Sequence, residues 1–99
     1  MRHLFVVVRT RGPAWQHGRP LEQQEKWTEH AAFMDALVDD EFVLLAGPLE
    51  GTSDVLLIIR AESPGEIENR LAADVWAKRK LLLPKQTIPW TLRLGTLPS

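Results

Sequence analysis

The stretch FVLLAGPLEGTSDVLLIIR, residues 42–60, decides the fold of this chain. It contains two short segments, residues 42–46 and 54–60, whose Val, Leu and Ile content predicts β-strands. Gly47 and Pro48 stop the first strand, and a short glycine-containing turn leads into the second. Because strands joined by so short a connection pair in antiparallel fashion, the stretch predicts a β-hairpin within a sheet.

One helix is expected on each side of this hairpin. Residues 20–40 repeat apolar side chains at helical spacing, which predicts a long helix before it. After the hairpin, Ser63 and Glu66 have the spacing of a capping box, and this pair predicts the start of a short second helix. Ile67 and Leu71 are then the inward-facing residues of that helix.

Further strands are expected towards the two ends of the chain. Residues 4–9 are β-branched and apolar, which predicts a first strand, and residues 10–19 form a long loop after it. A last strand is expected over residues 88–94, where Pro89 favours an edge position or a bulge. Residues 76–84 are expected to be an irregular connection.

The resulting order, βαββαβ, predicts a single α+β domain of the ferredoxin-like type over residues 1–99. It has a four-stranded antiparallel sheet with two helices on one face. The strands at 4–9, 42–46 and 54–60 are apolar at nearly every position, whereas a sheet with one face in water alternates apolar and polar residues. Two helices cover only one face, so we expect a homodimer that packs through the other.

Composition narrows the possible partners. The chain has 99 residues, a net charge of −1 and scattered positive residues, so it lacks the basic stripe that binds nucleic acid. The absence of cysteine excludes disulfides, thiolate metal sites and a cysteine nucleophile. No segment fits a transmembrane span or a secretory signal, so we expect a cytoplasmic protein with no membrane partner.

His30 stands within the apolar stripe of the first helix. Positions three, four and seven apart share a helical face. The apolar members of this stripe are Trp27, Ala31, Met34, Leu37 and Val38. An imidazole directed into the interior needs a hydrogen-bonding partner, because burying a polar group unpaired is costly. His30 is therefore either a structural anchor or a general acid or base.

Asp74 is the candidate partner. It follows Leu71 by three residues and Ile67 by seven, so it falls on the inward side of the second helix. The two helices of this fold lie side by side, so His30 and Asp74 can approach each other. A carboxylate bonded to one ring nitrogen would orient the imidazole and leave the other nitrogen for a substrate proton. The alternative is a solvent-exposed Asp74 at the helix end, where the helix dipole disfavours a negative charge.

Four segments of the chain resemble one protein family. They are WTEHAAFMDAL at residues 27–37, FVLLAGPL at 42–49, LAADVW at 71–76 and PWTLRLG at 89–95. In this order, over essentially the whole chain, they resemble the YCII-related proteins of the dimeric α/β-barrel superfamily. The resemblance implies a ferredoxin-like protomer, a homodimer that forms a dimeric α/β barrel, and a pocket with a His/Asp pair. By position that pair is His30 and Asp74.

The same resemblance implies an enzyme. One branch of the family is similar to a dehydrochlorinase that acts on a chlorinated hydroxyquinol-type ring, and muconolactone isomerase is a relative at the superfamily level. Two positions depart from the family pattern. Val75 stands where the family usually has proline, which bears on the backbone at Asp74. Glu41 stands where glycine is common, which bears on the end of the first helix.

Other candidate residues surround the pair. The residues assigned to substrate binding are Arg9, Trp27, Met34, Gly47 and Trp76. Arg9 and Arg11 could neutralise an anionic substrate, although solvated surface is the favoured alternative for both. The aromatic and thioether side chains, Trp90 included, could line a cavity or pack in the core. Trp15 and His17 lie in the long loop, which could cover the pocket as a lid. The histidines share no metal-ligand spacing, so no metal is expected.

These residues predict a cofactor-independent enzyme of the lyase or isomerase type, and the resemblance implies a dehydrochlorinase-like one. His30 would move a proton on a small aromatic or enol-bearing substrate, and Asp74 would orient it. Three alternatives remain open. The chain could be a non-catalytic ligand-binding or sensor dimer with the same pocket, or a cofactor-free monooxygenase, or the pair could be purely structural.

Overall fold

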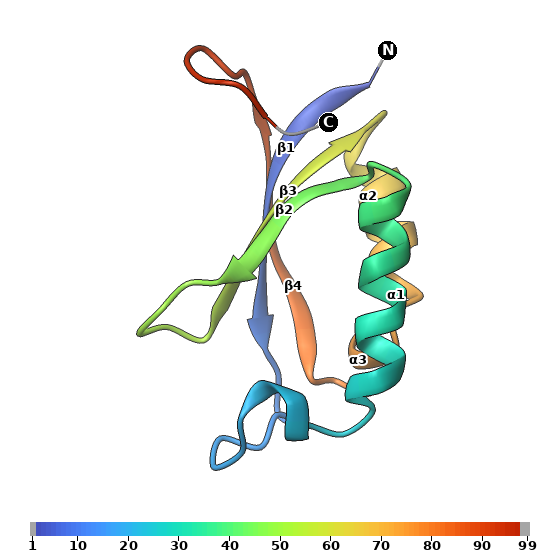
Figure 1. Ribbon diagram of the computed structural model, residues 1–99, viewed down its shortest axis with the longest axis vertical. Coiled ribbons are helices and arrows are strands. Elements are labelled where there is room, and N and C mark those ends of the chain that lie inside the picture. The colour runs from blue at the N-terminus through green and yellow to red at the C-terminus, as the bar shows by residue number, and fades with distance from the viewer. Residues whose placement is uncertain (1, 98–99) are drawn as a thin grey trace.

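The computed structural model describes residues 2–97. The sheet and the helices form two layers, with the α-helices on one face of the sheet (Figure 1). In chain order the elements are β1 (His3–Arg11), α1 (Trp27–Asp39), β2 (Val43–Pro48), β3 (Asp54–Ala61), α2 (Pro64–Ala72), α3 (Val75–Lys78) and β4 (Leu82–Trp90). The strands pair in antiparallel fashion in the order β2-β3-β1-β4. The ferredoxin-like α+β fold expected from the sequence is confirmed.

The central strand β1 divides its side chains between the two faces of the sheet. Alternate residues of a strand point to opposite faces. Phe5, Val7 and Arg9 are buried on the face that the helices cover. Between Val8 and Arg9 the pairing of β1 with β4 shifts register, which leaves Lys85 as an extra residue in β4. This alternation puts one arginine among the core residues of the covered face.

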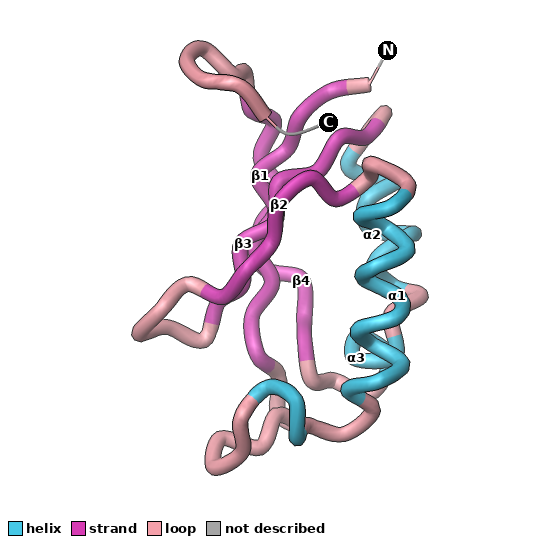
Figure 2. The backbone as a smooth tube through the Cα atoms, in the orientation of Figure 1, coloured by secondary structure: helices cyan, strands magenta, loops and turns pink. Residues whose placement is uncertain are grey.

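Two apolar clusters hold the layers together. The larger lies between α1, α2 and the sheet and includes Phe5, Val7, Leu37, Phe42, Ile59 and Ile67. The smaller consists of Trp15, Trp76, Leu81 and Leu82. Figure 2 shows α3, which carries Trp76, beside the first turns of α1. Trp27, the first residue of α1, packs against the smaller cluster, which therefore fixes the position of α3 relative to the start of α1.

The first helix is shorter than the range 20–40 predicts. A 3-10 turn, η1 (Leu21–Gln23), precedes α1, and Lys26 separates the two in a left-handed conformation with φ of 61°. A residue in that conformation interrupts helical hydrogen bonding, so the apolar periodicity alone overestimated the helix. The apolar stripe is also narrower than expected, because Val38 is 48% exposed at its edge. Within residues 2–97, no helix has both the length and the apolar character needed to cross a membrane.

Three further boundaries differ from expectation. The range 76–84, expected to be irregular, holds most of α3 and the start of β4. The last strand therefore begins and ends earlier than the range 88–94 predicts. β2 continues through Gly47 and Pro48 instead of stopping before them. Both β2 and β4 are edge strands, and an edge strand tolerates proline because its outer N–H groups need no partner in the sheet. The edge position expected for Pro89 is confirmed.

Candidate active site

His30 projects from the first turn of α1 into a position where it is only 8% exposed. Its imidazole stacks on the indole of Trp76, with 3.7 Å between ring centroids and 6° between planes. The indole is fixed in turn, because Nε1 of Trp76 donates a hydrogen bond of 2.6 Å to the carbonyl oxygen of Glu25. Trp27 lies tilted beside both rings of this stacked pair, 6.0 Å from the imidazole centroid and 5.9 Å from the Trp76 centroid. The plane of the His30 ring is therefore set by its aromatic neighbours.

Asp74 is fully buried at the N-terminus of α3. The spacing from Leu71 predicted a position on the second helix, but α2 ends at Ala72 and Asp74 is the N-cap residue of α3. Its Oδ1 accepts a hydrogen bond of 3.0 Å from the backbone N–H of Trp76. The sequence predicts the inward direction of the Asp74 side chain correctly, but the position on the second helix from which it was inferred is wrong. A carboxylate at a helix N-terminus is favourable, so the expected conflict with the helix dipole does not arise.

His30 and Asp74 are in hydrogen-bond contact, as the sequence predicts. Nδ1 of His30 lies 3.0 Å from Oδ1 and 2.9 Å from Oδ2 of Asp74. Because an ionised carboxylate only accepts hydrogen bonds, this geometry assigns the N–H of a neutral imidazole to Nδ1. Nε2 then carries the lone pair, and nothing within residues 2–97 hydrogen-bonds to it. The site thus presents an oriented nitrogen that can accept a proton.

Arg9 completes the buried polar group. Its Nη1 lies 3.1 Å from Oδ2 of Asp74, and the whole residue is 3% exposed. The solvated position favoured for Arg9 from the sequence is therefore wrong. On β1 it has the same parity as Phe5 and Val7, which places it on the covered face. We call Arg9, His30 and Asp74 the polar trio.

The charges of the polar trio favour an ionised Asp74. Burial acts to raise the pKa of its carboxyl, but His30, the N–H of Trp76 and the charge of Arg9 together bring that pKa below its usual value. Burial lowers the pKa of Arg9, while the charge and hydrogen bond of Asp74 oppose the shift. The guanidinium stays protonated because its ordinary pKa is so high. The ionised carboxylate of Asp74 consequently accepts the hydrogen bond from Nδ1 of His30 and holds the ring in place.

A cavity of about 370 Å³ opens beside His30, and we call it the His30 cavity. The five residues that the sequence assigns to substrate binding all line it: Arg9, Trp27, Met34, Gly47 and Trp76. They come from β1, α1, β2 and α3, so the fold gathers segments far apart in the sequence. The volume is within the range of small-molecule sites, about 300–1,000 Å³.

The long loop after β1 forms a fixed wall of this cavity. Trp15 lines it and meets Trp76 edge to face, with 5.4 Å between centroids. Gln24 is buried and holds the loop, because its side-chain amide donates to the carbonyls of Gln16 and Arg19 at 2.7 and 2.9 Å. Its Oε1 also accepts from the backbone N–H of Gln16 at 3.0 Å. No local sequence pattern signals this role for Gln24.

Three other residues named from the sequence divide between the cavity and the surface. Arg11 lines the His30 cavity with its guanidinium 4.4 Å from the ring centroid of Trp15, and its Nε is a buried donor without a partner in residues 2–97. Trp90 does not line the cavity, because its pairing with Leu4 puts it on the uncovered face of the sheet. His17 is exposed in the loop. Over the described residues, no three His, Asp or Glu side chains gather as metal ligands would.

Comparison with known proteins bears on the fold. No family model and no curated protein matches this chain. A solved structure matches: 5-chloro-2-hydroxyhydroquinone dehydrochlorinase from Burkholderia phenoliruptrix AC1100, in complex with 2,5-dihydroxybenzoquinone, with a TM-score of 0.56. The two sequences are 24% identical, and the match covers 93% of this chain and 95% of that one. At this identity the likeness shows a common fold.

Proposed function

We propose that this chain is a cofactor-independent enzyme that moves a proton on a small aromatic or enol-bearing substrate, in a reaction of the lyase or isomerase type. The observation that carries the proposal is the contact of Nδ1 of His30 with both carboxylate oxygens of Asp74, at 2.9 and 3.0 Å, beside a cavity of about 370 Å³. A histidine held in this way at one nitrogen offers the other as a general base.

In this proposal each member of the site has a distinct role. His30 accepts the substrate proton at Nε2, and Asp74 is the positioning residue that keeps the imidazole in the required tautomer. Once protonated, the imidazolium lies between the Asp74 carboxylate and the face of Trp76, and both stabilise a cation. Arg9 keeps Asp74 ionised, so the proton stays on His30 until it is returned or released.

A chlorinated hydroxyquinol is the substrate class we favour. The similar solved protein is a dehydrochlorinase of such a compound with a dihydroxybenzoquinone bound. The indoles that line the His30 cavity suit a planar ring, and Arg11 in the same lining brings a guanidinium group that can donate to a ring oxygen. In the reaction His30 transfers one hydroxyl proton of the substrate to the ring carbon that bears chlorine. It then accepts a second hydroxyl proton as chloride leaves with the electrons of the C–Cl bond. The net loss of HCl converts the hydroxyquinol to a hydroxyquinone without an added oxidant.

Chloride release from 5-chloro-2-hydroxyhydroquinone under anaerobic conditions tests this function. We expect turnover by the wild-type chain and a loss of at least about a hundredfold in kcat for His30→Gln, the usual contribution of a general base. His17→Gln is the matched control, because that histidine is exposed and outside the cavity. Equal kcat for His30→Gln and wild type would contradict the assigned base. Tight binding of 2,5-dihydroxybenzoquinone with no turnover would instead favour a binding module.

We also propose that two copies pack through the uncovered face of the sheet into a dimeric α/β barrel, and that the chain is a YCII-related protein. The support for the dimer is a row of apolar side chains, one from each strand in direct register: Leu45, Ile58, Val6 and Ile88. Leu45 and Ile88 are 48% and 42% exposed, and the α-helices lie on the other face of the sheet (Figure 1). A contiguous apolar patch of this kind marks an interface. The support for the family is the order of the four segments together with this fold.

A further inference from the structure

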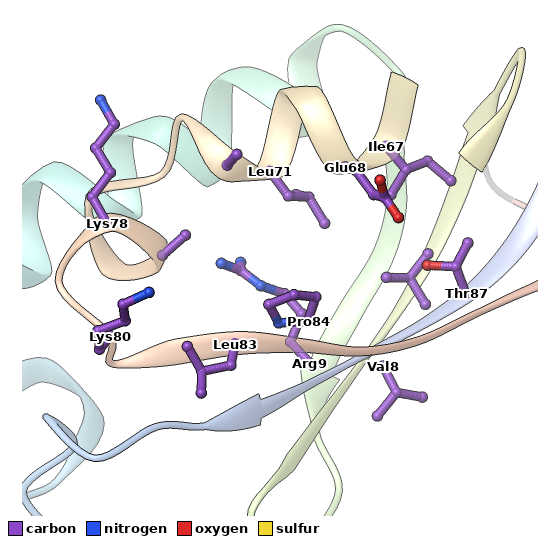
Figure 3. Close-up of a pocket in the computed structure, with 13 residues that line it drawn as sticks. Val8, Arg9, Ile67, Glu68, Leu71, Lys78, Lys80, Leu83, Pro84 and Thr87 are labelled. Atoms are coloured by element: carbon purple, nitrogen blue, oxygen red, sulfur yellow. The ribbon is translucent and has the colours of Figure 1, made fainter. Parts of the chain in front are cut away.

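Arg9 borders a second cavity besides the His30 cavity. Its volume is about 360 Å³, and it lies between α2, α3, β1 and β4 (Figure 3). Neither His30 nor Asp74 lines it. The apolar part of its lining includes Val7, Ile67, Leu71, Leu83 and Pro84. We call it the Leu83 cavity.

A register shift between β1 and β4 borders this cavity, because Val8, Arg9 and Pro84 all line it. The register shift lies between Val8 and Arg9, where Arg9 pairs with Pro84 while Val8 pairs with Gln86. On the other side of the cavity, α2 ends at Ala72 and α3 begins at Val75. The cavity therefore lies where the pairing of β1 with β4 is irregular and where α2 gives way to α3.

Cationic groups gather at one end of the Leu83 cavity. The guanidinium of Arg9 enters it from below, and the ammonium of Lys80 is directed towards the same space, whereas that of Lys78 points away (Figure 3). Glu68 stands at the opposite end beside Thr87, and it is exposed to solvent. The cavity therefore has a cationic end and a mildly acidic rim, joined by apolar walls.

The guanidinium of Arg9 has donors to spare. Arginine carries five N–H donors, and within residues 2–97 the hydrogen bond from Nη1 to Asp74 is the one that Arg9 makes. The residue is only 3% exposed, so its remaining donors can meet little besides the contents of the two cavities that it lines. A buried arginine with unused donors favours a planar anion that accepts two parallel hydrogen bonds.

We propose that the Leu83 cavity binds a small organic carboxylate with an apolar tail, whose head is held by Arg9 and Lys80. The carboxylate matches the fork of the guanidinium, and a short hydrocarbon chain matches the walls. The proposal concerns binding and not turnover: neither His30 nor Asp74 lines the Leu83 cavity, although Arg9 is shared with the polar trio.

Octanoate is a suitable probe for this site, with octan-1-ol as the ligand of equal tail and no charge. Titration followed by two-dimensional NMR is expected to shift the amide signals of Ile67, Leu71 and Leu83 while those of Ala31 and Met34 stay in place. Octanoate is expected to bind at least about tenfold more tightly than octan-1-ol, because charge-assisted hydrogen bonds are the strong ones. Equal affinity would overturn the anionic head, and shifts at Ala31 and Met34 alone would overturn the location.

Two pairs of variants separate the site from the surface around it. Lys80→Asn removes the ammonium group at the end of the cavity, and Lys26→Asn is its control. Both lysines are exposed, and both have a left-handed backbone conformation, with φ of 66° and 61°. We expect about threefold weaker octanoate binding for the first and no change for the second.

Ala72→Phe projects a ring into the cavity and should abolish octanoate binding. Ala73→Phe is its control, because Ala73 is exposed and does not line the cavity, and this variant should still bind octanoate. Undiminished binding in both Lys80→Asn and Ala72→Phe would refute the proposal.

Discussion

The two faces of the sheet differ in how their side chains are satisfied. The covered face buries the polar trio among apolar residues, and each member has a charged or hydrogen-bonding partner in the group. The uncovered face carries the apolar row of Leu45, Ile58, Val6 and Ile88 with no layer over it. One face depends on a complete set of polar contacts within the protomer. The other depends on apolar surface that a second copy can cover.

The largest expected effect comes from breaking the polar trio. Asp74→Ala leaves the guanidinium of Arg9 buried without its anion, and such a change costs about 3–5 kcal/mol of folding free energy. Asp40→Ala is the control, because it removes an exposed aspartate that pairs with Arg70 at 2.8 Å and should cost less than about 1 kcal/mol. Urea unfolding of the two variants measures the difference. Similar losses for both would mean that the covered face does not depend on the trio.

The next effect concerns the uncovered face. Ile88→Lys places a charge in the apolar row and should weaken self-association at least tenfold, because a buried unpaired charge is strongly unfavourable. Val38→Lys adds the same charge at a similarly exposed position on α1, outside the sheet, and should leave association unchanged. Analytical ultracentrifugation over a range of concentrations gives both dissociation constants. A wild-type chain that stays monomeric at high concentration would contradict the proposed dimer.

The same two faces explain how much the sequence could predict. The strand and helix order was predictable because the hairpin and both helix patterns are local. His30 was predictable because its helical stripe is apolar. The position of Arg9 was also available, since it shares the parity of Phe5 and Val7, but an arginine at a strand end more often faces water. A local sequence pattern therefore predicts which helices and strands form more reliably than it predicts which polar side chains those elements bury.

Other features had no local signal. The helix α3 (Val75–Lys78) is one turn long, too short for apolar periodicity to reveal, and it is the element that turns Asp74 inward. The anchoring of the loop by Gln24 depends on backbone groups of Gln16 and Arg19, which the chain brings together only on folding. The site was therefore predictable as a pair of residues, while the geometry that holds the pair was not.

The smallest effect is a pH dependence that belongs to the covered face alone. The pKa of Asp74 is lower in the folded chain than its ordinary value of about 3.9, so ionised Asp74 stabilises the fold above that value, and its contribution is lost as pH falls through the folded pKa. At pH 5 the free energy of unfolding of the wild-type chain should therefore exceed that of Asp74→Asn. This difference should shrink as the pH falls below about 4.

Urea titrations of both proteins at pH 5, 4, 3 and 2 test this dependence. Ile88→Lys serves as the reference from the other face, because it removes no carboxyl group, and its difference from wild type should not follow the titration of Asp74. A gap between wild type and Asp74→Asn that stays constant from pH 5 to pH 2 would mean that the carboxyl of Asp74 titrates alike in the folded and unfolded chains. The hydrogen bonds from His30, Arg9 and Trp76 make that outcome incompatible with the buried geometry.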